Sequence, residues 1–336
     1  MQYSIVMPVY KRSEIISLSL NSILSQSFAP LELIIVDNNT KDKETKKLKK
    51  IINDYSKKTT HPIIYKKCPK NSGALARNIG AAVASGDLIA FLDSDVVLDF
   101  DYYETLAKYF DSDDKLIAIQ GLDRSLLEVE LFRGNSNTIK KLTYHFEQIF
   151  ETSLLFNKKK PYVSPSLAIA HPSLADEFEL YSEWISTCAG IFKKSLFKKY
   201  KFPEQFITYS NNEYLMFSYQ LYKNDEGKMI YTSKAKYKDI QTNNGRINRI
   251  ELMYQIQTYD LYIFIRVFKI NFKNIIIFIK SRIGHLLFYQ ARLIIKKEFS
   301  LNLFINSIGS IFYPFFHFFS IIKGDLSFYE RDFPIK

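Results

Sequence analysis

Short apolar runs alternate with amphipathic stretches through the first part of the chain. Runs of strand length occur at residues 4–9, 33–36, 63–65, 88–92 and 116–120. Between them, apolar side chains recur at helical spacing over residues 13–27, 44–57, 73–85 and 102–110. Ser13 is a candidate cap for the first helix. Strands that alternate with helices predict a largely parallel sheet covered by helices, which is the α/β fold class.

The pattern weakens in the middle of the chain and returns as helices near the end. Residues 121–185 are less regular, and the Lys-Lys-Lys-Pro run at 158–161 predicts an exposed loop. Periodicity returns at residues 185–192 and 212–223, and amphipathic helices are predicted from about residue 248. We therefore predict an α/β domain over residues 1–245 and a helical, amphipathic region over residues 246–336.

Two of the predicted C-terminal helices carry a polar stripe beside an apolar one. In the first, polar positions step by three and four through Arg282, His285, Tyr289, Arg292 and Lys296. The second, residues 301–322, is about 33 Å long at 1.5 Å per residue, enough to span a bilayer. Its polar stripe favours instead a helix that lies in a membrane interface or packs on another helix. Packing of these helices on the α/β domain is the alternative.

The chain is basic, and the excess charge is concentrated near its end. The formal net charge is +11, and residues 241–336 hold 13 Lys or Arg against 6 Asp or Glu. Such a surface suits an anionic membrane, a phosphorylated substrate or nucleic acid. The sequence contains no recognisable nucleic-acid-binding module, so we expect no nucleic-acid partner. A charged surface that only keeps the protein soluble is the alternative.

The cysteines and the N-terminus indicate a compartment. Cys68 and Cys188 are too few for a disulfide framework or a metal cluster, which favours a reducing environment. Residues 1–3 carry no basic region and Pro8 interrupts the apolar run that follows, so no signal peptide is predicted. We expect a cytoplasmic protein.

Candidate chemistry collects at the carboxyl ends of the predicted strands, where open α/β sheets bind their ligands. Tyr10 follows the first strand, Asp37 ends the second, and Asp93 and Asp95 follow the fourth. An aspartate in such a place is usually a turn residue or a helix cap. Asp93 and Asp95 flank a single residue, however, so both carboxylates can face one crevice. Hard oxygen ligands of this kind suit Mg²⁺ or Mn²⁺ together with substrate phosphates.

A helix that opens with a glycine lies just upstream of these carboxylates. The segment Asn-Ser-Gly-Ala-Leu-Ala-Arg-Asn-Ile-Gly at residues 71–80 places Arg77 near the start of that helix. A helix N-terminus and an arginine both suit a diphosphate. For Arg77 taken alone, a salt-bridged arginine on a surface helix is the alternative.

Four segments combine these features in a fixed order. They are an apolar strand ending in Pro-Val-Tyr, a Val-Asp-Asn-Asn-Thr-Lys-Asp turn, the Gly-x-x-x-Ala-Arg-Asn-x-Gly helix and a Gly-Asp-x-Ile-x-Phe-Leu-Asp-x-Asp strand, at residues 4–10, 33–42, 71–80 and 85–95. Together they resemble the N-terminal signature of family 2 glycosyltransferases, and their order and spacing make the resemblance specific. It implies a GT-A fold with a mixed, Rossmann-like sheet, a nucleotide-sugar donor, a divalent metal and inversion at the anomeric carbon.

By position, the resemblance assigns roles to individual residues. Asp37 corresponds to the residue that hydrogen-bonds the nucleotide base, and Pro8 and Tyr10 correspond to residues that line the base pocket. Asp93 is implied to lie near the ribose and the metal, and Asp95 to be the direct metal ligand.

Two later segments continue the resemblance more weakly. Residues 187–194, which contain Gly190, resemble the small-residue strand that closes over the donor sugar. Residues 213–223 resemble the family's Glu-Asp-x-x-Phe-x-x-Arg-Leu helix, but the aspartate of that motif is Tyr214 here. The arginine of the motif is likewise replaced, by Gln220.

Glu213 is the only acid left in that motif. We expect it to be the catalytic base, since an ionised glutamate near pH 7 can accept a hydroxyl proton within hydrogen-bond reach. A one-residue shift of the helix, or a degenerate site, is the alternative. The family often has a histidine metal ligand soon after this helix, and Asp239 is the candidate to replace it.

The sequence therefore predicts an inverting, metal-assisted glycosyltransferase that transfers a sugar from a nucleotide-diphosphate donor to a hydroxyl acceptor. A glycan or lipid-linked acceptor from cell-surface polysaccharide synthesis is expected. We also expect peripheral contact with an anionic membrane, at the inner face of the plasma membrane. A GT-A protein that has lost catalysis and only binds a ligand or partner is the alternative, because Tyr214 replaces the family's aspartate.

Overall fold

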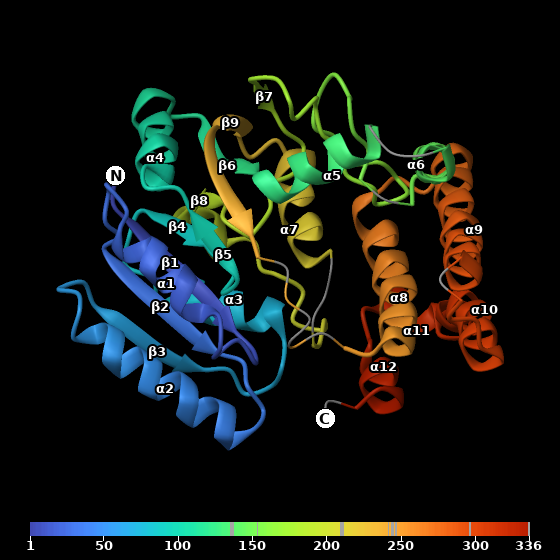
Figure 1. Ribbon diagram of the computed structural model, residues 1–336, viewed down its shortest axis with the longest axis horizontal. Helices are drawn as coiled ribbons and strands as arrows, with labels where there is room; N and C mark the ends of the chain where they lie inside the picture. The colour runs from blue at the N-terminus through green and yellow to red at the C-terminus, as the bar shows by residue number, and fades with distance from the viewer. Residues whose placement is uncertain are drawn as a thin grey trace.

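A single mixed sheet organises the first 240 residues of the computed structural model. The structure describes residues 1–134, 138–152, 154–208, 212–240, 242, 245, 247–295 and 297–334. The strands are β1 (Tyr3–Val9), β2 (Glu32–Asp37), β3 (Ile63–Lys67), β4 (Leu88–Phe91), β5 (Val96–Leu98), β6 (Leu116–Asp123), β7 (Glu179–Tyr181), β8 (Ile191–Lys193) and β9 (Lys228–Asp239). Their order is β3–β2–β1–β4–β8–β6–β9–β5, with β7 beside β9 (Figure 1).

Helices cover both faces of this sheet. Strand residues point alternately to the two faces, so Ile5 and Ile35 join one core cluster and Val6 and Ile34 the other. The first cluster packs against α1 (Ile16–Leu24), α2 (Asp42–Ser56) and α4 (Tyr102–Ser112). The second packs against α3 (Gly73–Val83), the 3₁₀ turn η1 (Lys194–Lys198), α7 (Glu213–Lys223) and α8 (Arg249–Val267).

The strand directions bring the loops of the predicted site to one edge. β1 pairs in parallel with β2 and with β4, and β2 pairs in parallel with β3. The loops after Val9, Asp37 and Phe91 therefore leave the sheet at the same side. This confirms the predicted α/β class and places the loops of the predicted site at one edge of the sheet.

The remaining helices lie beside the sheet, two of them in the middle of the chain and the others near its end. They are α5 (Arg124–Gly134), α6 (Thr138–Phe150), α8, α9 (Phe272–Ile295), α10 (Leu301–Phe316), α11 (Phe318–Lys323) and α12 (Ser327–Asp332). In Figure 1, α8 lies next to α7, and α9 and α10 form the edge of the molecule farthest from β3. None of the helices in the described part of the chain is long and apolar enough to cross a bilayer.

Several sequence predictions need correction. Ser13 does not cap α1, which begins at Ile16 without a side-chain cap. Residues 121–185 contain α5, α6 and β7, and the long strand β9 also escaped prediction. The single helix predicted over residues 301–322 is interrupted at His317, three residues after Pro314.

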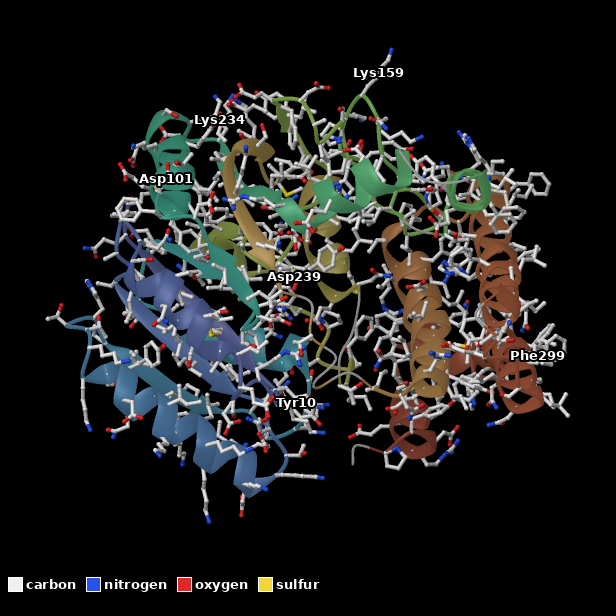
Figure 2. All side chains as sticks on the ribbon, viewed as in Figure 1. Tyr10, Asp101, Lys159, Lys234, Asp239 and Phe299 are labelled. Carbon is white, nitrogen blue, oxygen red and sulfur yellow. The ribbon has the colours of Figure 1, made fainter. Side chains whose placement is uncertain are left out.

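Other predictions hold or stay open. The basic run at 158–161 is the expected loop, and Figure 2 shows Lys159 pointing away from the body of the molecule. The sheet ends at Asp239 and α8 begins at Arg249, but the division into domains at residue 245 remains a prediction.

Candidate active site

A cleft lies where the loops after β1, β2 and β4 meet the start of α7 and the end of β9. Figure 2 shows two of its residues, Tyr10 and Asp239, in the middle of the molecule between the sheet and the C-terminal helices. The structure brings most of the predicted site residues to this cleft, namely Pro8, Tyr10, Arg77, Asp93, Asp95, Glu213 and Asp239.

Backbone hydrogen bonds hold the turn that carries the two aspartates. The N–H of Asp93 donates to the carbonyl of Cys188 at 2.9 Å, and the N–H of Ile240 donates to the carbonyl of Asp95 at 2.9 Å. The turn after β4 is therefore fixed from two sides, by the segment before β8 and by the chain after β9. Both carboxylates face the cleft, as their spacing predicted.

Arg12 is a cleft residue that the sequence analysis overlooked. Its Nε donates to Oδ2 of Asp95 at 3.2 Å, while its Nη1 is buried and has no hydrogen-bond partner among the described residues. A buried donor without a partner costs about 1–3 kcal/mol, so this nitrogen is suited to an anionic ligand. A basic residue soon after the end of a strand was the available signal.

Two residues at the cleft have a strained backbone, one in the loop after β1 and one in the segment before α7. Lys11, just before Arg12, has φ 52°, and its N–H donates to Oδ1 of Asn39 at 2.7 Å. Thr208, which also lines the cleft, has φ 59°, an outlier for a β-branched residue. Such strain persists where the surrounding structure fixes it, and it concentrates at ligand sites.

Arg77 links two carboxylates. Its Nη2 contacts Oδ1 of Asp93 at 2.7 Å and its Nη1 pairs with Oε1 of Glu213. Burial opposes the charge of Arg77, but Glu213 and Asp93 hold its pKa above the usual value. Arg77 is only 7% exposed, which excludes a surface arginine, and its Nε has no hydrogen-bond partner among the described residues.

Glu213 reaches the cleft from the first turn of α7. It is 3% exposed, and a Cβ added at Gly73 would lie 2.8 Å from its Oε1, so the glycine at the start of α3 allows this approach. Tyr214, the residue in place of the family's aspartate, also lines the cleft, with its ring 6.5 Å from that of Trp184.

Asp239 enters the cleft from the last position of β9. It pairs with Val96 in the ladder between β9 and β5, one residue from Asp95. Asp93, Asp95 and Asp239 therefore face one cleft. In the side-chain positions described, no group of three or more His, Cys, Asp or Glu residues is close enough to hold a metal by itself.

Two predicted residues do not line the cleft. Asp37 is fully buried and accepts hydrogen bonds from Asn39, Thr45, Tyr65 and Lys67. Burial opposes its ionisation, but these hydrogen bonds hold its pKa below the usual value. Because Asn39 in turn accepts the N–H of Lys11, Asp37 supports the loop of Tyr10 and Arg12 from behind.

Gly190 is the second predicted residue that does not line the cleft, and its role is in packing. A Cβ at this position would lie 2.2 Å from the carbonyl oxygen of Ser186. The glycine therefore permits the tight path of residues 186–190, and Thr187 and Cys188 of this segment line the cleft.

The carboxylates and the charges around them fit a divalent cation. Burial raises the pKa of Asp95, the negative charge of Asp93 raises it further, and Arg12 opposes the shift. A cation between the two carboxylates would relieve that repulsion. Mg²⁺ is commonly held by one or two carboxylates plus substrate phosphates, so Asp93 and Asp95 would suffice as protein ligands.

Curated relatives match parts of the chain. A poly(ribitol-phosphate) beta-glucosyltransferase of Bacillus spizizenii is 28% identical over 174 residues, which cover 47% of this chain and 26% of that protein. The UDP-Glc:alpha-D-GlcNAc-diphosphoundecaprenol beta-1,3-glucosyltransferase WfgD of Escherichia coli is 38% identical over 100 residues, 27% of this chain and 34% of that protein. The aligned region thus spans about a third or less of each relative.

Solved structures share the fold at low sequence identity. S. aureus TarS, residues 1–349, aligns with a TM-score of 0.52 and 17% identity over 94% of this chain and 81% of that one. The mannosyltransferase PcManGT of Pyrobaculum calidifontis, in complex with GDP-Man and Mn²⁺, aligns with a TM-score of 0.51 and 12% identity, covering 92% and 73%. The predicted GT-A fold, with its C-terminal helical region, is confirmed.

The family follows from the sequence itself. The model of Glycosyl transferase family 2 matches residues 4–178, slightly more than half of the chain. This range contains the four N-terminal segments that carried the resemblance. The protein belongs to glycosyl transferase family 2.

Proposed function

We propose that the protein is an inverting glycosyltransferase that transfers a sugar from a nucleotide-diphosphate donor to a hydroxyl acceptor, assisted by Mg²⁺ or Mn²⁺. One observation carries the proposal. Asp93 and Asp95 share a cleft with two arginines, and each arginine has a buried nitrogen without a hydrogen-bond partner among the described residues. The structures of TarS with UDP-GlcNAc and of PcManGT with GDP-Man and Mn²⁺ support this class of donor.

The charged residues divide the task of holding the donor. Asp95, with Asp93 beside it, would hold the cation, which when bound neutralises charge that develops on the diphosphate leaving group. Nη1 of Arg12 and Nε of Arg77 would donate to phosphate oxygens, because both nitrogens lack other partners in the described structure. Pro8 and Tyr10 would contact the nucleotide base, and Asp239 would assist at the metal.

Glu213 is the proposed catalytic base. It faces the cleft, and Arg77 links its carboxylate to that of Asp93 through two ion pairs, Glu213–Arg77 and Arg77–Asp93. A base must lie within hydrogen-bond reach of the acceptor hydroxyl, and distances often shorten only when substrate binds. Arg77 would then bind the diphosphate as it leaves, which weakens its hold on Glu213.

A second candidate function follows from the same residues. Glu213 is engaged by Arg77, and Tyr214 replaces the family's aspartate. A GT-A domain that binds a nucleotide sugar without transferring it would show these two features. Transfer or donor hydrolysis separates the two candidates, because the binding module turns over neither.

We propose that the acceptor is a glycan or a lipid-linked sugar. The names of the B. spizizenii and E. coli relatives contain a poly(ribitol-phosphate) and a diphosphoundecaprenol acceptor. A second cavity shares Tyr214 with the cleft and is lined by Asp260, Arg282 and His285. Burial and the charge of Arg282 lower the pKa of His285 to about 3, so this wall offers a neutral imidazole to a polar acceptor.

A cytoplasmic location fits the cysteines. Cys68 and Cys188 are both free thiols, and Cys188 lines the cleft. Free thiols persist in reducing compartments. We therefore place the transfer reaction on the cytoplasmic side.

The experiment combines metal removal with one matched pair of variants. Donor hydrolysis and transfer are measured with a panel of UDP- and GDP-sugars in Mn²⁺, in EDTA, and for Asp95→Asn. Loss of a metal contact worth several kcal/mol lowers the rate by roughly 10²–10³-fold. The control is Asp101→Asn, an exposed aspartate with no capping bond that lies far from Tyr10 in Figure 2. Undiminished activity after exhaustive metal removal would sink the assignment.

A further inference from the structure

Helix α9 turns its polar side inward. Oγ of Ser281 donates to the carbonyl of Glu151 at 3.2 Å, and Arg282 pairs with Asp260 of α8. Further along α9, the amide of Gln290 hydrogen-bonds Ser307 of α10. The polar stripe predicted from the sequence therefore packs against the protein, except that Lys296 and the side chain of Arg292 lie outside the described residues.

The apolar side of α9 faces outward as a consequence. Ile275, Ile279, Ile283 and Leu287 follow one another at intervals of four and form a single stripe along the helix. They are between 36% and 49% exposed. Since the inner side of α9 is occupied by ordered polar contacts, rotation of the helix cannot bury this stripe without breaking them.

Helices α10 and α11 repeat the arrangement. Ser307, Ser310 and Pro314 are buried on the inner side of α10. On the outer side Phe312, Phe315, Phe316 and Phe319 are exposed, Phe316 by 84% and Phe319 by 79%. These four phenylalanines and the four α9 residues are called the apolar ridge. In Figure 2, Phe299, from the segment between α9 and α10, marks the same outer edge of the molecule.

Positive charge borders the ridge. Residues 269–323 contain eight Lys or Arg and a single acid, Glu298, and one of the eight, Arg282, is paired inward with Asp260. Glu298 is paired with Arg249 at 2.7 Å. Lys269, Lys273 and Lys323 are exposed at the ends of the ridge. An apolar surface with a cationic border complements an anionic bilayer, whose headgroups attract the lysines while its acyl boundary receives the phenylalanines.

We propose that the apolar ridge docks on the surface of an anionic lipid bilayer, with α9 and α10 lying in the plane of the interface. Apolar side chains of such helices enter the headgroup and acyl boundary by about 5–10 Å. Helices α9 and α10, which carry seven of the eight ridge residues, lie on the far side of α8 from the sheet, so docking through them leaves the cleft free (Figure 1). The proposal concerns attachment and does not depend on the reaction in the cleft.

The test is flotation of the full-length protein with vesicles of phosphatidylcholine, with and without phosphatidylglycerol. The parent protein should float with the anionic vesicles, and high salt should release only part of it because apolar burial persists when charge is screened. The variant Phe315→Ser/Phe316→Ser/Phe319→Ser should lose binding by roughly tenfold or more. These side chains are exposed, so the thermal unfolding transition of the variant should match that of the parent.

Two controls make the result specific. Phe100→Ser/Tyr181→Ser removes two exposed aromatic side chains elsewhere on the protein and should leave flotation unchanged. Lys269→Gln/Lys273→Gln/Lys323→Gln should weaken binding to anionic vesicles alone. Equal flotation of the parent and the phenylalanine variant overturns the proposal. So does a parent protein that ignores vesicles but forms a dimer that the phenylalanine variant cannot form, because the ridge would then be covered by a second copy.

Discussion

Arg12 and Arg77 contact three carboxylates of the cleft, in two separate groups. Arg12 contacts Asp95, whereas Arg77 contacts both Asp93 and Glu213. The sequence could predict the acids and Arg77 because they occupy motif positions with fixed spacing. It could not predict the pairing of Arg77 with Glu213, since 136 positions separate the two residues and only the tertiary fold brings the first turn of α7 close to Gly73 at the start of α3.

The role of Glu213 can be tested through pH dependence. If Glu213 accepts the acceptor's proton, Glu213→Gln should lower turnover by about 10²–10⁴-fold and remove the acidic limb of the pH–rate profile. Glu213→Asp keeps a carboxylate and should keep that limb. The exposed Glu204→Gln, on the loop before α7, is the matched control and should behave as the parent. A Glu213→Gln variant that retains both turnover and the limb would shift the role of base to Asp239 or another acid.

At the level of elements, prediction succeeded where periodicity and local chemistry agreed. The parallel strands β1, β2 and β4 are apolar runs buried throughout, apart from partly exposed Pro8, and each was found from sequence alone. β9 was missed because lysines and hydroxyl residues alternate with its apolar positions, and its place depends on pairing with distant strands. For α9 the helical periodicity was predicted correctly, but periodicity does not say which side of the helix faces the protein.

The segment that leads into β7 contains a buried histidine with a measurable consequence. His171 is fully buried among Phe156, Trp184 and Tyr231, and its Nε2 has no hydrogen-bond partner among the described residues. Burial lowers its pKa to about 3. In the unfolded chain His171 binds a proton near pH 6.5, whereas in the folded protein it stays neutral. The contribution of the neutral side chain to the free energy of unfolding is therefore complete above pH 6.5 and is lost as the pH falls toward 3.

Replacement of His171 should therefore reduce acid sensitivity. Relative to the parent, His171→Leu should flatten the fall in the free energy of unfolding between pH 6.5 and 4 by up to about 1.4 kcal/mol per pH unit. Denaturant unfolding at a series of pH values measures this slope. The exposed His61→Leu serves as control and should keep the slope of the parent. An unchanged slope in His171→Leu would show that the imidazole is protonated in the folded protein.

For the whole molecule, the cleft is assembled from parts of the chain that are far apart. The loop after β1 supplies Arg12, the turn after β4 supplies Asp93 and Asp95, and α7 supplies Glu213. On the opposite side of α8, α9 and α10 form the outer edge that carries the apolar ridge (Figure 1). The cleft and the ridge therefore use different surfaces, and a variant in one should leave the other intact.

The most direct test of the central claim is the binding of a nucleoside diphosphate to the cleft, measured by titration calorimetry with UDP and GDP. One of the two should bind the parent protein in Mn²⁺ and lose affinity by roughly tenfold or more in EDTA, because the cation joins the diphosphate to Asp93 and Asp95. Asp95→Asn should show the same loss in Mn²⁺, and Asp101→Asn should bind as the parent does. Equal affinity in Mn²⁺ and in EDTA, or full affinity in Asp95→Asn, would contradict a metal-assisted donor site in this cleft.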